Sequence, residues 1–102
     1  MASYSNPGGS LVSGRQTVTT SGTRVQLTTT ATSILEVVVT AETDNSGVIT
    51  VGGADVVGAL ATRKGYPLQA GESIVLGVGN LSGVYIDTTV NGDGVTYLAV
   101  SA

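Results

Sequence analysis

The sequence predicts an all-β fold. We expect a single compact, jelly-roll-like β-sandwich or barrel of about seven to nine short antiparallel strands, with an extended N-terminal arm. The strand count also fits an immunoglobulin-like sandwich, and the strand order stays open. Short runs rich in Val, Ile and Thr alternate with clusters of Gly, Asn, Asp and Ser at intervals of about 8–12 residues. No segment carries a sustained helical period of apolar residues flanked by caps. The length of 102 residues suits one domain.

The N-terminal segment, residues 1–14, is rich in Ser, Gly, Asn and Pro. Such a composition buries too little apolar surface to fold alone, so we expect either a flexible tail or an arm that becomes ordered on a neighbouring molecule. The sandwich domain is then expected to span residues 15–102. The anchors of a docking arm would be Tyr4, Pro7, Leu11 and Val12.

The first half of the domain contains the strongest strand signals. Residues 16–20 and 24–28 flank a Gly-containing turn, which predicts a hairpin. The segment 34–42 alternates with period two and places Leu35, Val37, Val39 and Ala41 on one face. Further strands are expected at 48–51, 55–58, 66–68, 73–78, 84–88 and 95–100.

The composition excludes several classes of function. Charged residues make up 11% of the chain, against roughly 25% in a typical domain, and the net charge is −3. The few basic side chains cannot neutralise a phosphate backbone, so we do not expect nucleic acid as a partner. No apolar run approaches the ~20 residues of a membrane helix, so no membrane partner is expected either.

Catalytic groups are also scarce. The chain has no Cys and no His, which removes Ser–His–Asp and Cys–His nucleophile systems and Cys-based zinc sites. We therefore predict that the protein is not an enzyme and has no cofactor and no metal. The turn at residues 91–94 (Asn-Gly-Asp-Gly) has the chemistry of a hairpin turn more than of a calcium loop, although Asp87 and Asp93 could share a weakly bound cation.

Three side chains outside the arm are candidates for contact with a partner. Arg63 and Lys64 lie in an expected exposed loop, where they either meet an acidic partner or are simply solvated. Tyr85 is out of phase with its apolar neighbours, so it is either an exposed interface residue or a partly buried Tyr whose hydroxyl reaches water.

The phrases RQTVTTSGTRVQLTT, NSGVITVGG and LQAGESIVLGVGNLSGVYIDTTVNGDGVTYLAV cover most of the chain after the arm. In these phrases the sequence resembles small phage virion structural proteins of the head decoration, or capsid cement, type. The resemblance implies a protein on the outer surface of the phage head that binds the assembled major capsid protein, often as a homotrimer, and stabilises the shell. The alternative is a receptor-binding or fibre-associated β module of a phage virion.

Overall fold

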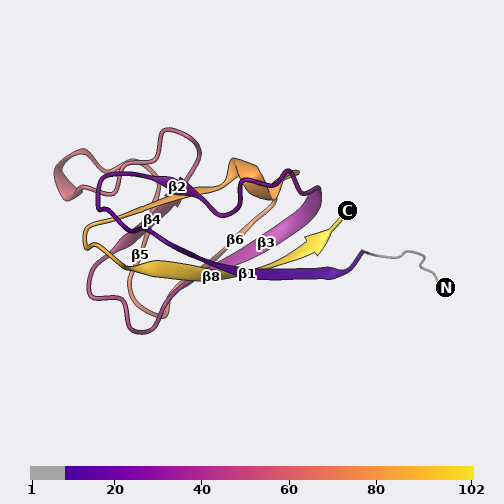
Figure 1. Cartoon of the computed structure of the whole chain (residues 1–102), viewed down its shortest axis with the longest axis horizontal. Helices are drawn as coiled ribbons and strands as arrows, with labels where there is room; N and C mark the ends of the chain where they lie inside the picture. The colour runs from indigo at the N-terminus through magenta and orange to yellow at the C-terminus, as the bar shows by residue number, and fades with distance from the viewer. Residues whose placement is uncertain (1–8) are drawn as a thin grey trace.

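The structure, a computed structural model, describes residues 9–102, and this part of the chain forms eight strands in two antiparallel four-stranded sheets (Figure 1). The predicted all-β sandwich is therefore confirmed. The strands are β1 (Leu11–Thr17), β2 (Val25–Gln26), β3 (Ile34–Ala41), β4 (Ile49–Gly52), β5 (Tyr66–Leu68), β6 (Ser73–Leu76), β7 (Tyr85–Thr88) and β8 (Gly94–Ser101). Two 3₁₀ turns, η1 (Leu60–Thr62) and η2 (Leu81–Gly83), lie in the connections. The described residues include no helix with the length and apolar character needed to span a membrane.

The strand order is that of a jelly roll. One sheet has the order β1-β8-β3-β6 and the other β2-β7-β4-β5. The first strand pairs with the last, the second with the seventh, the third with the sixth and the fourth with the fifth. The chain thus follows one long folded hairpin, and every connection except that between β4 and β5 crosses from one sheet to the other. This is the double Greek key of the jelly roll, built as an open sandwich rather than a closed barrel.

The core lies between the two sheets and consists of aliphatic side chains. Alternate residues of each strand point inward, as the pleat of a strand requires. The fully buried core side chains include Val18, Val37, Val39, Ile49, Leu68, Leu81, Ile86 and Val95. Each such side chain contributes about 1.5–3 kcal/mol relative to an exposed one, so a core without Phe or Trp still holds the sheets together.

The N-terminal boundary of the domain differs from the expected one. Strand β1 begins at Leu11, so residues 11–14, which we expected to belong to the arm, lie in the sheet. They pair with β8 in a continuous register from Leu11 opposite Val100 to Thr17 opposite Gly94. The backbone partner supplied by β8 orders a segment whose own composition predicts disorder.

The predicted hairpin of residues 16–20 and 24–28 is wrong, although the turn between them is present. The turn is closed by the Thr23 amide, which donates to the carbonyl of Thr20. The chain then crosses to the other sheet, where β2 pairs with β7 rather than with β1. Val18 is buried between the sheets, and its burial directs the chain from one sheet to the other. Sequence spacing alone does not distinguish this crossing from a hairpin.

Strand β3 confirms most of the predicted alternation and contradicts it at its start. Val37, Val39 and Ala41 are buried, but Leu35 is exposed and Ile34 is buried in its place. The pairing of β3 with β8 shifts between Ile34 and Glu36, which marks a β-bulge. The extra residue of a bulge reverses which side chains face the core. The strand expected at 55–58 is reduced to a single bridge between Val57 and Lys64.

Candidate binding surface

An apolar surface lies on the outer side of the β1-β8-β3-β6 sheet. Leu98 on β8 is opposite Val38 on β3, and Val38 is opposite Val75 on β6, so the three side chains form a row across the strands. Leu11 and Val100 form the next pair. We call these five residues the apolar face. Leu11, Val75 and Leu98 are 70%, 61% and 45% exposed, which is unusual for large apolar side chains gathered on one face of a sheet.

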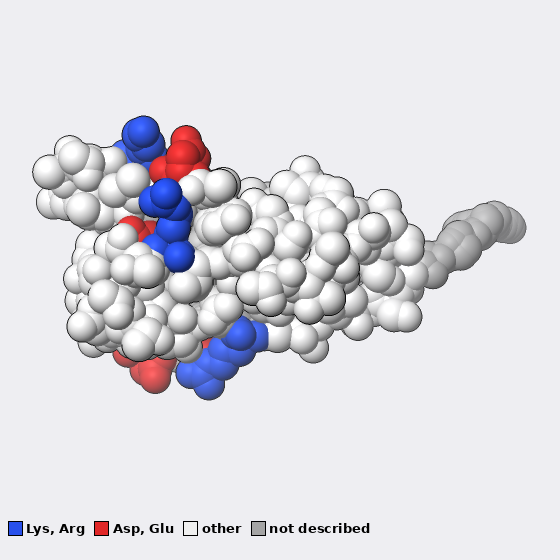
Figure 2. All heavy atoms as spheres, turned by 45° about the horizontal axis from the view of Figure 1, so that its top comes forward, with Lys and Arg blue, Asp and Glu red and all other residues white. Residues whose placement is uncertain are grey.

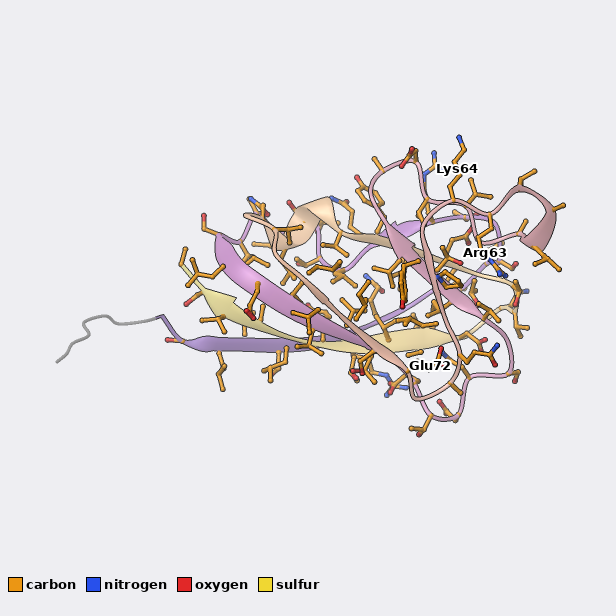
Figure 3. The ribbon with its side chains drawn as sticks, turned by 180° about the vertical axis from the view of Figure 1, so that it is seen from behind. Arg63, Lys64 and Glu72 are labelled. Atoms are coloured by element: carbon orange, nitrogen blue, oxygen red, sulfur yellow. The ribbon has the colours of Figure 1, made fainter. Side chains whose placement is uncertain are left out.

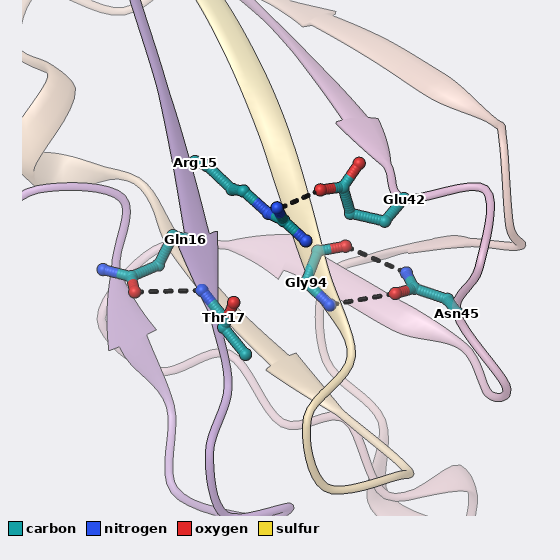
Figure 4. Close-up of polar contacts among 6 residues, drawn as sticks. All are labelled: Arg15, Gln16, Thr17, Glu42, Asn45 and Gly94. Atoms are coloured by element: carbon teal, nitrogen blue, oxygen red, sulfur yellow. Dashed lines mark hydrogen bonds and ion pairs between the residues drawn. The ribbon is translucent and has the colours of Figure 1, made fainter.

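Charge is sparse on this side of the sheet. The guanidinium Nε of Arg15 lies 2.7 Å from Glu42 Oε2, so these two charges offset one another at the end of the sheet (Figure 4). Glu36 lies beside the apolar face, opposite Val100. On the side of the molecule that Figure 2 brings forward, which is that of β2 and β4, the charged side chains lie toward the end remote from the N-terminus. The apolar face therefore suits a partner surface of low charge better than a strongly charged one.

A shallow depression of about 290 Å³ lies on the same sheet and is lined by Val38, Thr40, Thr96, Tyr97 and Leu98. Small-molecule sites usually occupy about 300–1,000 Å³ and include convergent polar groups. None of the lining side chains carries a charge, and Tyr97 packs against the core. The depression has room for an apolar side chain of another molecule. Its lining residues include no acid–base or nucleophile–base pair of the kind used in catalysis.

The two most buried carboxylates serve the loops. Asp87, which is 2% exposed, accepts hydrogen bonds from the backbone amides of Gly22 at 3.0 Å, Thr88 at 2.8 Å and Gly58 at 2.8 Å. These three donors come from different parts of the chain. Backbone N–H groups that point at a carboxylate offset its desolvation. Asp87 therefore fastens the turn after β1 and the long β4–β5 loop to strand β7.

Asp93, at the end of the turn between β7 and β8, likewise accepts hydrogen bonds from the backbone of a loop. Its two carboxylate oxygens accept from the amides of Ser46 at 3.0 Å and Gly47 at 2.7 Å. Within residues 9–102 the structure contains no cluster of acidic side chains that could hold a metal ion. Backbone N–H groups thus satisfy the carboxylates of Asp87 and Asp93. The structure gives no support for the weakly bound cation that these two residues could share.

The side-chain amides of Asn45 and Gln16 fasten neighbouring segments of the chain near the same end. Asn45 donates through Nδ2 to the carbonyl of Gly94 and accepts from the Gly94 amide through Oδ1, both at 2.9 Å (Figure 4). Gln16 donates through Nε2 to the carbonyl of Gln26 on β2 at 2.7 Å. Its Oε1 accepts from the Thr17 amide at 3.0 Å. These contacts fix the start of β8 and the end of β1.

The β4–β5 loop places its two basic residues differently (Figure 3). Arg63 is half-buried, and its Nε and Nη2 each lie 3.4 Å from the carbonyl oxygen of Gly58, so it braces the loop. Lys64 is exposed and extends away from the sandwich. Leu60, on η1, is also exposed. Of the two basic candidates, Lys64 is the one presented to a partner.

The remaining predicted contact residues do not gather at one site. Tyr4 and Pro7 lie outside the described residues. Leu11 belongs to the apolar face, but Val12 packs against the core and is not presented outward. Tyr85 is half-buried on β7, in the opposite sheet.

Sequence reasoning missed Val75 and Leu98, which form the centre of the surface. The signal was available, because each is an apolar residue out of phase with the core-facing positions of its own strand. Leu98 lies between the inward Tyr97 and Ala99, and Val75 lies between the inward Ile74 and Leu76. Comparison of the chain with protein-family models, with curated proteins and with solved structures finds no match.

Proposed function

We propose that the protein is a decoration, or cement, protein of a phage head, which binds the assembled major capsid protein through the apolar face and stabilises the shell. The observation that carries the proposal is the row of Leu98, Val38 and Val75 with the neighbouring Leu11, left uncovered on an ordered sheet. An apolar patch of this kind on a small protein typically marks an interface. The jelly-roll order adds support, because viral structural proteins often use this fold.

The proposed mechanism needs no chemistry beyond binding. The apolar face and the shallow depression beside it would exclude water against a complementary, weakly charged patch of the shell. Copies joined to one another on the shell would make several such contacts at once, and linked contacts strengthen one another. Each capsomer would then be held to its neighbours by a bound β-sandwich, which raises the free energy needed to separate them.

The test uses expanded heads of the encoding phage that lack this protein. Purified protein is titrated onto the heads, and bound copies are counted after sedimentation. We expect saturation at a fixed number of copies and heads that survive higher temperatures. Leu98→Asp should abolish binding, because it buries a charge against an apolar partner. Leu60→Asp, at the exposed tip of η1, is the matched control and should bind normally. Absence of saturable binding by the wild-type protein contradicts the proposal.

The second candidate function, a receptor-binding or fibre-associated module, is favoured by one observation. The β4–β5 loop presents exposed Leu60 and Lys64 together on a segment that Asp87 and Arg63 hold in place. A fixed loop with an apolar tip is a common way to contact another molecule. In that case Leu60→Asp, and not Leu98→Asp, removes attachment to host cells, so the same pair of variants separates the two functions.

A further inference from the structure

The two sheets have four edge strands, and these differ in how readily they could pair with a strand of another chain. Three are short: β2 has two residues, β5 has three with Pro67 in the middle, and β6 has four. Strand β1 has seven residues, contains no Pro or Lys, and runs without a bulge along β8. It follows the lower margin of the molecule in Figure 1. Proteins usually protect such long, regular edge strands against pairing with other chains. An unprotected edge strand therefore indicates that a strand of another chain pairs with it.

The pairing of β1 with β8 determines which N–H and C=O groups of β1 point away from the sheet. In an antiparallel ladder, alternate residues direct their N–H and C=O groups to the neighbouring strand. The Ser101 amide donates to the carbonyl of Ser10, so even-numbered positions of β1 are turned to β8. The Thr17 amide, which faces the open side, is taken by Gln16 Oε1. Leu11, Ser13 and Arg15 are left with backbone groups directed away from the sheet.

We propose that a second copy of this chain occupies this edge, with the two β1 strands antiparallel about a two-fold axis at Ser13. In this register Ser13 lies opposite Ser13 of the second copy, and Leu11 lies opposite Arg15 of the second copy. Every open residue then has a partner. An axis at Arg15 would place two like charges opposite one another, and an axis at Gly14 would require the Thr17 amide that Gln16 already holds.

The side chains agree with this arrangement. Leu11 is 70% exposed, and it would lie against the aliphatic stem of Arg15 from the second copy. The two four-stranded sheets would become one continuous sheet, and the two apolar faces would lie side by side on it. Two-fold contacts of this kind are self-complementary and are the commonest in homo-oligomers. The pairing goes beyond the proposed function and does not depend on it.

The test is the mass of the full-length protein in solution, measured by sedimentation equilibrium over a broad range of concentrations. We expect a dimer or an even multiple of the chain. Ser13 is exposed, so Ser13→Lys and Ser13→Glu should each fold normally and each weaken self-association about fivefold or more, because like charges then meet across the axis. Ser13→Ala is the control and should associate like the wild-type protein.

The decisive sample is an equal mixture of Ser13→Lys and Ser13→Glu. Only a register that places position 13 against itself makes the mixture associate as strongly as the wild-type protein or more strongly. Equal association of the wild-type protein, the two charged variants and their mixture overturns the register. A wild-type protein that is monomeric throughout, or present only in odd multiples, overturns the pairing with a second copy and leaves the edge to a strand of another protein. None of these outcomes depends on binding to heads.

Discussion

The hydrogen bonds of Asp87 should make this carboxylate one of the most important polar groups for stability. The substitution Asp87→Asn keeps the shape of the side chain and replaces one acceptor oxygen by a donor. Asp87 Oδ1 serves Gly22 and Thr88, whereas Oδ2 serves Gly58. Whichever way the amide is turned, at least one backbone N–H loses its acceptor. With the oxygen kept at Oδ1, the N–H that loses it belongs to the buried residue Gly58.

The magnitude follows from these contacts. A buried donor without an acceptor costs about 1–3 kcal/mol, and each of the other two bonds weakens when its acceptor loses its charge. The free energy of unfolding should therefore fall by about 2–4 kcal/mol, out of the roughly 5–15 kcal/mol of a typical domain. With a slope of about 1–1.5 kcal/mol per M, the urea midpoint falls by roughly 1–4 M.

The assay is equilibrium unfolding in urea, followed by circular dichroism with the slope fitted for each variant. Asp55→Asn is the matched control, because Asp55 is exposed on the β4–β5 loop that Asp87 holds, and its free energy of unfolding should stay within about 0.5 kcal/mol of the wild-type value. A change of less than about 0.5 kcal/mol for Asp87→Asn would contradict this role of Asp87, since it would mean that the three amides do not depend on the carboxylate.

Three further predictions use the same unfolding assay. Ile49→Ala, in the centre of the core, should cost about 2–5 kcal/mol, whereas Leu60→Ala at an exposed position should change stability little; similar values for both would contradict the assigned core. Gly65→Ala should lower the free energy of unfolding more than Gly22→Ala. Both residues have positive φ, which alone costs about 1–2 kcal/mol for a residue with a Cβ. A Cβ on Gly65 would also lie 2.7 Å from the Val51 carbonyl oxygen, whereas a Cβ on Gly22 would meet open space. Arg15→Ala should cost under about 1 kcal/mol, and the difference should shrink in high salt, because the Arg15 side chain of its ion pair with Glu42 is 65% exposed; a large, salt-independent loss would show another role for Arg15.

The sequence carried enough local information for the class of fold and for most strand positions. The alternation around Val37 and Val39, and the Gly-containing turns, are short-range signals that survive in the structure. Pairing partners depend on contacts between distant residues. The choice of β8 as the partner of β1, and of β7 as the partner of β2, brings together residues more than fifty positions apart, and no local pattern encodes it.

The same limit explains the errors at single residues. Leu35 and Ile34 exchanged places because of a bulge, which is visible only once β8 lies beside β3. The sequence offered Asp87 only a weakly bound cation shared with Asp93, because the loop whose Gly58 amide binds Asp87 comes from a separate part of the sequence. The apolar face was partly readable, since Val75 and Leu98 break the phase of their own strands. Their position in one row, on either side of Val38, depends on the register of three strands.

A cryo-electron microscopy reconstruction of expanded heads saturated with the protein would show directly where and how it binds. We predict a β-sandwich on the outer surface of the shell at every equivalent position, with the β1-β8-β3-β6 sheet turned toward the capsid protein and Leu98 and Val75 in contact with it. A bound sandwich with this sheet facing solvent would contradict the assignment of the apolar face. Heads that carry no density for the protein would contradict the proposed function itself.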